Sequence, residues 1–129
     1  VLNMHLTQRS CDIALGLPYN IAGYSFLLHL YARILRMRPG VLSHLLVDAH
    51  IYTSGEDGSN EEYNHIPGLV EQLNRPCRKL PTLTIDDRIQ TLNDVDSFIK
   101  SNPSTEEILN TFRIIGYEPY LNIKFKPAV

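Results

Sequence analysis

Residues 2–35, LNMHLTQRSCDIALGLPYNIAGYSFLLHLYARIL, change from one hydrophobic period to another. Leu2, Met4 and Leu6 alternate with polar side chains, which is typical of a half-buried strand. From Asn20 onward, apolar residues recur at the three- and four-residue spacing of an amphipathic helix of about five turns. These residues are Ile21, Tyr24, Leu27, Leu28, Tyr31, Ile34 and Leu35. The stretch therefore predicts a strand, a polar loop and then a long helix.

A second strand is predicted from Val41 to Tyr52, and one of its faces is polar. Side chains alternate between the two faces of a strand, so a single face carries His44, Asp48, His50 and Tyr52. The residues that follow, 54–63, are rich in Gly, Glu, Asp, Ser and Asn. This composition predicts a loop on the surface.

The rest of the sequence continues the alternation of helices and strands. The apolar spacing of Ile66, Leu69, Val70 and Leu73 predicts an amphipathic helix. Ser104 and Glu107 resemble a capping box at the start of a short helix. Extended segments are predicted over residues 80–85, 112–115 and 122–125. Residues 86–102 carry no periodicity that assigns them to an element.

The composition argues against several classes of protein. A net charge of −2 over 129 residues gives no general attraction to nucleic acid or to an anionic membrane, so we expect neither partner. No apolar run approaches the roughly 18 residues of a membrane-spanning helix. Two cysteines without zinc-ligand spacing predict neither a disulfide framework nor a metal site. We therefore expect a reducing compartment, the cytoplasm, with the nucleus and the mitochondrion as alternatives.

Polar residues at the end of the first strand are candidates for binding an anion. Arg9 and Ser10 offer a guanidinium fork and a hydroxyl to one phosphate, and an ion pair between Arg9 and Asp12 is the alternative. Asn20, beside the expected start of the helix, is either an N-cap or a ligand to a pyrimidine edge. Its amide suits uracil in one orientation and cytosine in the other, so the residue type alone leaves the base open.

The polar face of the second strand offers further candidates. His50 or Tyr52 could hydrogen-bond a sugar hydroxyl, although a lone histidine more often has a structural role. A metal site that uses Asp48 and His44 is disfavoured, because residues four apart on an extended strand are spread over about 13 to 14 Å.

Three blocks of sequence resemble the nucleotide-binding signatures of thymidylate synthase, in that family's order and nearly its spacing. The blocks are Gln8-Arg9-Ser10-Cys11-Asp12, Leu15-Gly16-Leu17-Pro18-Tyr19-Asn20-Ile21-Ala22 and Asp48-Ala49-His50-Ile51-Tyr52. Later segments, such as Asn64-His65-Ile66 and Gly116-Tyr117-Glu118-Pro119, resemble the family's C-terminal region. The resemblance implies an α+β fold, a large mixed sheet with packed helices, of which residues 1–129 form the C-terminal portion of a single domain.

The resemblance implies that this chain contacts the substrate dUMP. Arg9 and Ser10 would bind the 5′-phosphate, and Asn20 would bind the pyrimidine edge. His50 and Tyr52 would bind the 3′-hydroxyl of the deoxyribose. Asparagine at the base-binding position favours uracil, since relatives that act on cytosine tend to carry an aspartate there.

The resemblance also implies a folate co-substrate, 5,10-methylenetetrahydrofolate, and no metal. Asp12 and Gly16 would line the site near the pterin, and the terminal carboxylate of Val129 would help to close the site against water. In this family a cysteine thiolate adds to C6 of the uracil, and C5 then attacks the one-carbon unit of the folate. Hydride transfer from the folate completes the reductive methylation to dTMP and releases dihydrofolate.

The family's nucleophilic cysteine lies in a Pro-Cys-His stretch that would precede Val1, so the catalytic residue is unknown for this chain. Cys11 and Cys77 have no histidine in a local motif and are expected to be inert. The expectation is therefore a C-terminal fragment that is inactive alone. It would work with the missing N-terminal half and with a second subunit in a homodimer.

Two other functions stay open at this point. A pyrimidine hydroxymethylase acting on dUMP uses the same scaffold and adds water where the synthase transfers hydride. A nucleotide-binding fragment without catalysis is the other alternative. Relative to the family, residues 54–63 are an insertion. Val47 stands where the family usually has glycine, and Tyr120-Leu121 stand where it usually has His-Pro, which indicates a divergent member.

Overall fold

The computed structural model describes residues 1–55, 58, 59 and 61–127. Part of the expected 54–63 loop and Val129, the expected folate contact, lie outside the described residues. The chain divides into two compact units, each built from three segments. Unit 1 comprises Val1–Met4, Tyr24–Leu42 and Lys79–Glu118, and unit 2 comprises the described residues of His5–Gly23, Ser43–Arg78 and Pro119–Val129.

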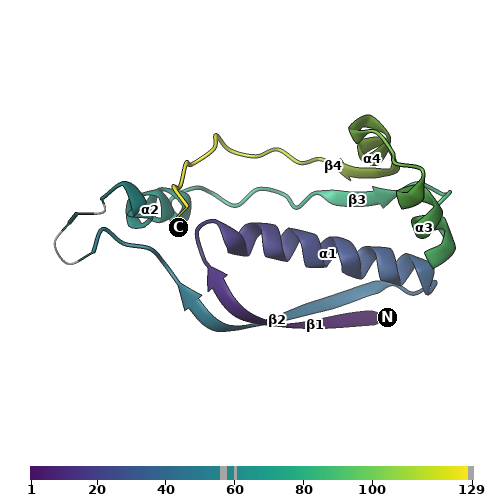
Figure 1. The fold of residues 1–129 in the computed structure, drawn as a ribbon, viewed down its shortest axis with the longest axis horizontal. Helices are drawn as coiled ribbons and strands as arrows, with labels where there is room; N and C mark the ends of the chain where they lie inside the picture. The colour runs from purple at the N-terminus through teal and green to yellow at the C-terminus, as the bar shows by residue number, and fades with distance from the viewer. Residues whose placement is uncertain (56–57, 60, 128–129) are drawn as a thin grey trace. The chain divides into compact units, whose positions relative to one another are not determined.

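The first three elements are a strand, a helix and a second strand, as predicted. They are β1 (Leu2–Asp12), α1 (Gly16–Ile34) and β2 (Pro39–His50), and β1 pairs with β2 (Figure 1). In unit 1 the Leu2 amide donates to the Arg38 carbonyl at 2.8 Å, and in unit 2 the Ile13 amide donates to the His50 carbonyl at 3.0 Å. Partner numbers rise together along both strands, so the strands are parallel and α1 is the connection between them.

The helix α1 begins before Asn20 because Asp12 orders the loop that precedes it. Asp12 Oδ1 accepts hydrogen bonds from the backbone amides of Ala14, at 2.9 Å, and Leu15, at 3.1 Å. Pro18 falls in the first turn, where its missing N–H costs no helical hydrogen bond. Asn20 therefore lies inside α1, and the N-cap alternative for this residue is wrong.

The second half of the chain adds shorter elements. They are η1 (Glu61–Tyr63), α2 (Ile66–Leu73), β3 (Thr82–Ile85), α3 (Leu92–Lys100), α4 (Thr105–Thr111) and β4 (Phe112–Ile115). β3 and β4 pair antiparallel, with Thr82 opposite Ile115 (Figure 1). The predicted bounds of α2 and β4 are confirmed, and so is the capping box at Ser104 and Glu107. The α+β class is confirmed, and the sheets among the described residues are each two-stranded.

The sequence left one stretch of this half unassigned, and one predicted extended segment is not assigned as a regular element. The helix α3 lies in the stretch that periodicity left unassigned, and a second capping box fixes its start. Thr91 Oγ1 accepts from the Asp94 amide at 3.2 Å, and Asp94 Oδ2 accepts from the Thr91 amide at 2.7 Å. Hydrogen bonds from Gln90 and Thr91 lower the pKa of Asp94. Residues 122–125, predicted as extended, form no assigned strand in the part of the chain that the structure describes.

The core of unit 1 is small, and one aromatic residue connects three of its elements. Its buried apolar residues are Leu28, Leu30, Ala32 and Ile89. Phe112, which begins β4, packs edge to face against Phe26 of α1, with ring centroids 5.2 Å apart. It packs in the same way against Phe98 of α3, at 5.8 Å.

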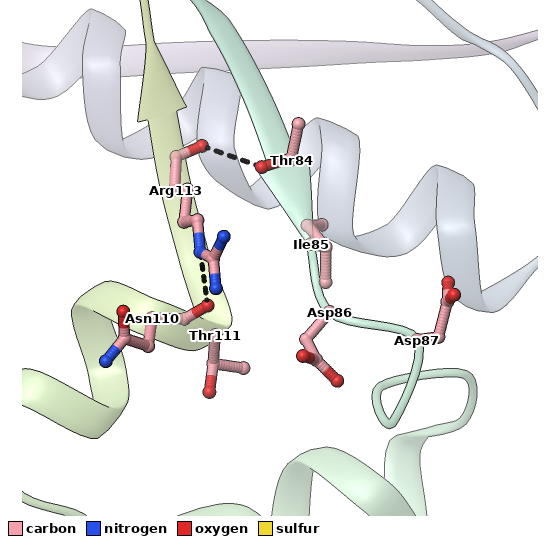
Figure 2. Close-up of a pocket in the computed structure, with 7 residues that line it drawn as sticks. All are labelled: Thr84, Ile85, Asp86, Asp87, Asn110, Thr111 and Arg113. Atoms are coloured by element: carbon pink, nitrogen blue, oxygen red, sulfur yellow. Dashed lines mark hydrogen bonds between the residues drawn. The ribbon is translucent and has the colours of Figure 1, made fainter.

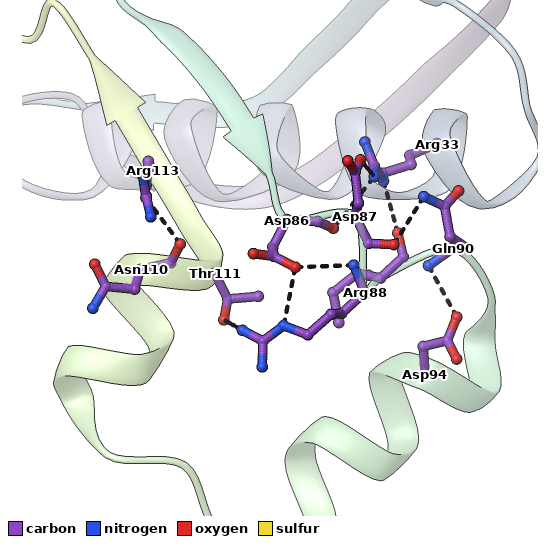
Figure 3. Close-up of polar contacts among 10 residues, drawn as sticks. Arg33, Asp86, Asp87, Arg88, Gln90, Asp94, Asn110, Thr111 and Arg113 are labelled. Atoms are coloured by element: carbon purple, nitrogen blue, oxygen red, sulfur yellow. Dashed lines mark hydrogen bonds and ion pairs between the residues drawn. The ribbon is translucent and has the colours of Figure 1, made fainter.

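Arg33 connects α1 with the loop that follows β3 (Figure 3). Its Nε donates to the Ile89 carbonyl at 2.7 Å, and its Nη2 donates to the Asp86 carbonyl at 3.3 Å and to Asp87 Oδ1 at 2.7 Å. The Asp87 side chain is 99% exposed, so water screens that ion pair. Ile89 is only 2% exposed, so its carbonyl depends on the Arg33 guanidinium for a partner.

Replacing Arg33 with methionine should lower the free energy of unfolding by about 1 to 2 kcal/mol, because the Ile89 carbonyl loses its donor. Replacing Asp87 with alanine removes only the screened ion pair and should change stability by less than about 0.5 kcal/mol. Urea unfolding of both variants measures the difference. Equal losses in the two variants would mean that the ion pair, rather than the carbonyl contact, stabilises the loop.

A pocket of about 220 Å³ lies in unit 1, and Figure 2 shows the residues that line it. They are Thr84, Ile85, Asp86, Asp87, Asn110, Thr111 and Arg113. Beside it, Arg88 Nε donates to Asp86 Oδ1 at 3.0 Å and Arg88 Nη2 donates to Thr111 Oγ1 at 3.3 Å (Figure 3). Hydrogen bonds from Arg88 lower the pKa of Asp86. The pocket contains none of the candidate site residues from the sequence. The described ones lie in unit 2 and are Arg9, Ser10, Asp12, Gly16, Asn20, His50 and Tyr52.

Candidate functional site

In unit 2 a glutamine connects residues of β1, α1 and β2. Gln8 Nε2 donates to the Ser10 carbonyl at 2.8 Å and to Asn20 Oδ1 at 2.9 Å. Gln8 Oε1 lies 2.9 Å from His44 Nε2. All four residues are half-buried, so these hydrogen bonds are partly shielded from water. The structure thus brings together Ser10 and Asn20, which the sequence placed ten residues apart.

Gly16, at the start of α1, lies beside the side chains of Asp12 and Asn20. A Cβ atom at Gly16 would lie 3.4 Å from Asn20 Oδ1 and 3.7 Å from Asp12 Cβ. The first turn of α1 therefore passes directly beside the side chains of Asp12 and Asn20. The absence of a side chain at Gly16 thus leaves space next to two other residues singled out from the sequence.

Arg9 is not part of this hydrogen-bonded cluster. It is exposed, whereas its neighbours Gln8 and Ser10 are half-buried, as the alternation of side chains along β1 requires. Among residues 1–55, 58, 59 and 61–127, no ion pair joins Arg9 to Asp12, whose Oδ1 instead accepts the amides of the following loop. The ion-pair alternative for Arg9 is therefore wrong.

His50 and Tyr52 belong to a row of four aromatic rings. Ring centroids are 5.3 Å apart for His50 and Tyr52, 5.6 Å for Tyr52 and His65, and 5.1 Å for His65 and Phe125. All three pairs are edge to face, an arrangement that aromatic pairs favour. His50 Nδ1 lies 3.3 Å from the Asp48 carbonyl, which helps to fix the orientation of the imidazole.

His65 is a residue to which the sequence assigned no role. It is 1% exposed, and its Nε2 lies 2.9 Å from the Lys126 carbonyl, so Nε2 carries the proton and donates. Within the described residues its Nδ1 has no hydrogen-bond partner, and it lies 4.0 Å from Asp12 Oδ1. His65 thus joins the aromatic row to Asp12. Its place in the Asn64-His65-Ile66 block was the signal that could have identified it.

The last described residues pack closely on α2. A Cβ at Gly68 would lie 2.6 Å from Phe125 Cε1 and 2.9 Å from Ile123 Cγ2, so only glycine allows this approach. Lys126 pairs with Glu62 at 2.5 Å, and its ammonium lies 4.6 Å from the centroid of the Tyr63 ring. The hydrogen bond between Lys126 and Glu62 lowers the pKa of the carboxyl and raises that of the amine. The C-terminal segment is therefore attached beside His65, up to the point where the described residues end.

The thiol of Cys11 is poorly suited to nucleophilic attack. Burial, and then the charge of Asp12, raise the pKa of Cys11, so its thiolate is disfavoured.

In the described residues, no group of three or more histidine, cysteine, aspartate or glutamate side chains is arranged to hold a metal ion. None of the described helices is long and apolar enough to cross a bilayer.

Comparisons with known proteins agree with the family resemblance of the three sequence blocks. The family model described as thymidylate synthase matches residues 1–129. The chain is 36% identical over 128 residues to a thymidylate synthase of Ascaris suum and 36% identical over 128 residues to that of Saccharomyces cerevisiae. It is 34% identical over 128 residues to a bifunctional dihydrofolate reductase-thymidylate synthase of Zea mays.

Each of these alignments covers 99% of this chain. The chain spans only part of each relative's own length: 36% of the Ascaris suum synthase, 35% of the Saccharomyces cerevisiae synthase and 20% of the bifunctional Zea mays protein. The family model spans Val1 to Val129 and therefore includes the segments that form the Gln8 cluster and the aromatic row. The chain belongs to the thymidylate synthase family.

Proposed function

We propose that this chain forms the dUMP-binding part of a thymidylate synthase, which methylates dUMP to dTMP with 5,10-methylenetetrahydrofolate. The observation that carries the proposal is the Gln8 cluster. It holds Ser10 and Asn20 together in unit 2, within a chain that matches the family from end to end. A half-buried polar cluster suits a ligand that has polar groups along one edge.

In this proposal each part of dUMP has its own contact. Arg9 and the hydroxyl of Ser10 bind the 5′-phosphate, because a guanidinium forms charge-assisted hydrogen bonds with phosphate oxygens. Asn20 hydrogen-bonds the pyrimidine edge. His50 and Tyr52, whose rings adjoin, bind the 3′-hydroxyl of the deoxyribose.

The folate would lie on the side of the site where Asp12 is found. The Asp12 carboxylate accepts hydrogen bonds from the pterin, and Gly16 leaves room beside it. Val129 is proposed to help to close the site and to exclude water from the reactive intermediate. The nucleophile is a cysteine thiolate other than Cys11, whose raised pKa argues against that role.

A second copy of the chain is the proposed partner. The outward-facing residues Leu45 and Val47 of β2 are 53% and 65% exposed, which suits a face that another subunit covers. We expect sedimentation of the full-length gene product to give a homodimer. Sedimentation as a monomer at micromolar concentration would contradict this part of the proposal.

Product analysis on the full-length gene product tests the function. With dUMP and 5,10-methylenetetrahydrofolate, we expect equal amounts of dTMP and dihydrofolate, because hydride transfer from the folate oxidises it. Hydroxymethyl-dUMP together with tetrahydrofolate would instead identify a pyrimidine hydroxymethylase. Binding of dUMP without either product would identify a nucleotide-binding protein that does not catalyse the reaction.

A further inference from the structure

The orientation of the Gln8 amide is fixed by a backbone carbonyl. The Ser10 carbonyl can only accept a hydrogen bond, and the Gln8 side-chain atom 2.8 Å from it must therefore be the Nε2 that donates. With the amide turned around, two oxygens would face each other at that distance. The other end of the amide, Oε1, consequently points towards His44, 2.9 Å away.

His44 must then present a proton to Gln8. Oε1 is only an acceptor, so His44 Nε2 carries hydrogen, which is true of one neutral tautomer and of the charged imidazolium. A half-buried oxygen without this donor would turn towards water. His44 thus keeps Gln8 in place at its oxygen end, while the Ser10 carbonyl keeps it in place at its nitrogen end.

The orientation of Asn20 follows from that of Gln8. The Gln8 Nε2 uses its second hydrogen at 2.9 Å from the Asn20 side chain, so the Asn20 atom facing it must be the oxygen. The Asn20 amino group is therefore turned away from Gln8. One of the two possible amide orientations is selected by a chain of hydrogen bonds that begins at His44.

We propose that His44 is a positioning residue that sets the preference of the site between the two pyrimidines. It acts through Gln8 on the Asn20 amide, and it does not itself touch the nucleotide. Uracil presents a donor at N3 and an acceptor at position 4, whereas cytosine presents an acceptor and a donor at the same places. An amide held in one orientation matches one of these edges, and an amide free to turn matches either. The inference rests on the proposed binding of dUMP at Asn20.

The test compares dUMP and dCMP binding to the full-length gene product by calorimetry. His44→Leu removes the donor at similar size, and we expect the ratio of dCMP to dUMP dissociation constants to fall about tenfold, the equivalent of one net hydrogen bond. His44→Gln places an amide donor near the position of Nε2 and should restore most of the ratio. His29→Leu, which removes an exposed histidine of α1 in unit 1, is the matched control and should leave the ratio unchanged.

The outcomes distinguish the role of His44 from the proposed binding of dUMP. An unchanged ratio in His44→Leu, with tight dUMP binding retained, would overturn the role of His44 and leave the proposed function intact. Failure of the wild-type protein to bind dUMP at all would overturn the proposed function itself. If His44→Leu does not fold, the ¹⁵N shifts of His44 in the wild-type protein decide. A proton on Nε2 supports the proposal, and a neutral ring with its proton on Nδ1 overturns it.

Discussion

Replacing Arg9 with alanine is expected to weaken dUMP binding by roughly 1.5 to 3 kcal/mol, which corresponds to about ten- to 150-fold in the dissociation constant. The reason is the loss of charge-assisted hydrogen bonds to the 5′-phosphate. Deoxyuridine, which lacks the phosphate, should bind the variant and the wild-type protein about equally. Titration calorimetry with the two ligands on the full-length gene product measures both values.

The exposure of Arg9 supports this expectation, and Arg38 provides a control. Arg9 is exposed at the end of β1 and, within the described residues, forms no ion pair, so its guanidinium is available to a ligand. Arg38 is also exposed and lies in unit 1, and Arg38→Ala should leave dUMP affinity unchanged. Equal losses of affinity for dUMP and deoxyuridine in Arg9→Ala would show that Arg9 does not bind the phosphate.

Replacing Asn20 with aspartate is expected to reverse the preference for the base. The carboxylate can still accept the hydrogen bond from Gln8 Nε2, now 2.9 Å from Asn20 Oδ1, so the cluster should persist. It can no longer donate to uracil O4, and two acceptors would face each other there. We expect dUMP affinity to fall about a hundredfold, the sum of a lost hydrogen bond and an unsatisfied polar group, while dCMP binding improves.

Asn20→Ala separates the change of base preference from a general loss of contacts. Alanine removes donor and acceptor together, so both nucleotides should bind more weakly and neither should be favoured. Competition between dUMP and dCMP for each variant gives the preference directly. An aspartate variant that keeps the wild-type preference for dUMP would mean that the pyrimidine edge is read elsewhere in the site.

Local sequence determined several elements correctly, because the information for each lies within one or two helical turns. The helix α2 follows from the apolar spacing between Ile66 and Leu73, and α4 follows from the reciprocal capping hydrogen bonds of Ser104 and Glu107. The helix α3 carried the same kind of signal at Thr91 and Asp94, but the second residue of its capping box is aspartate rather than the usual glutamate or glutamine. These elements needed no distant contact to be predicted.

Asn20 shows where local reasoning failed. An asparagine beside a predicted helix start is a common N-cap, but Asp12 already orders the preceding loop, and α1 begins earlier. The side chain of Asn20 is thereby left for Gln8, twelve positions away. The sequence offered Asn20 as a candidate site residue, and only the fold shows which of its atoms Gln8 engages.

The sequence by itself determined the family, the α+β class and most strands and helices, since these follow from motifs and periodicities along the chain. Only the tertiary structure decided that His44 donates to Gln8 across 36 positions and that buried His65 lies beside Asp12. The physical reason is that a hydrogen bond depends on the distance and direction between two groups. For residues far apart in sequence, those are set by the path of the whole backbone and not by the residues between them.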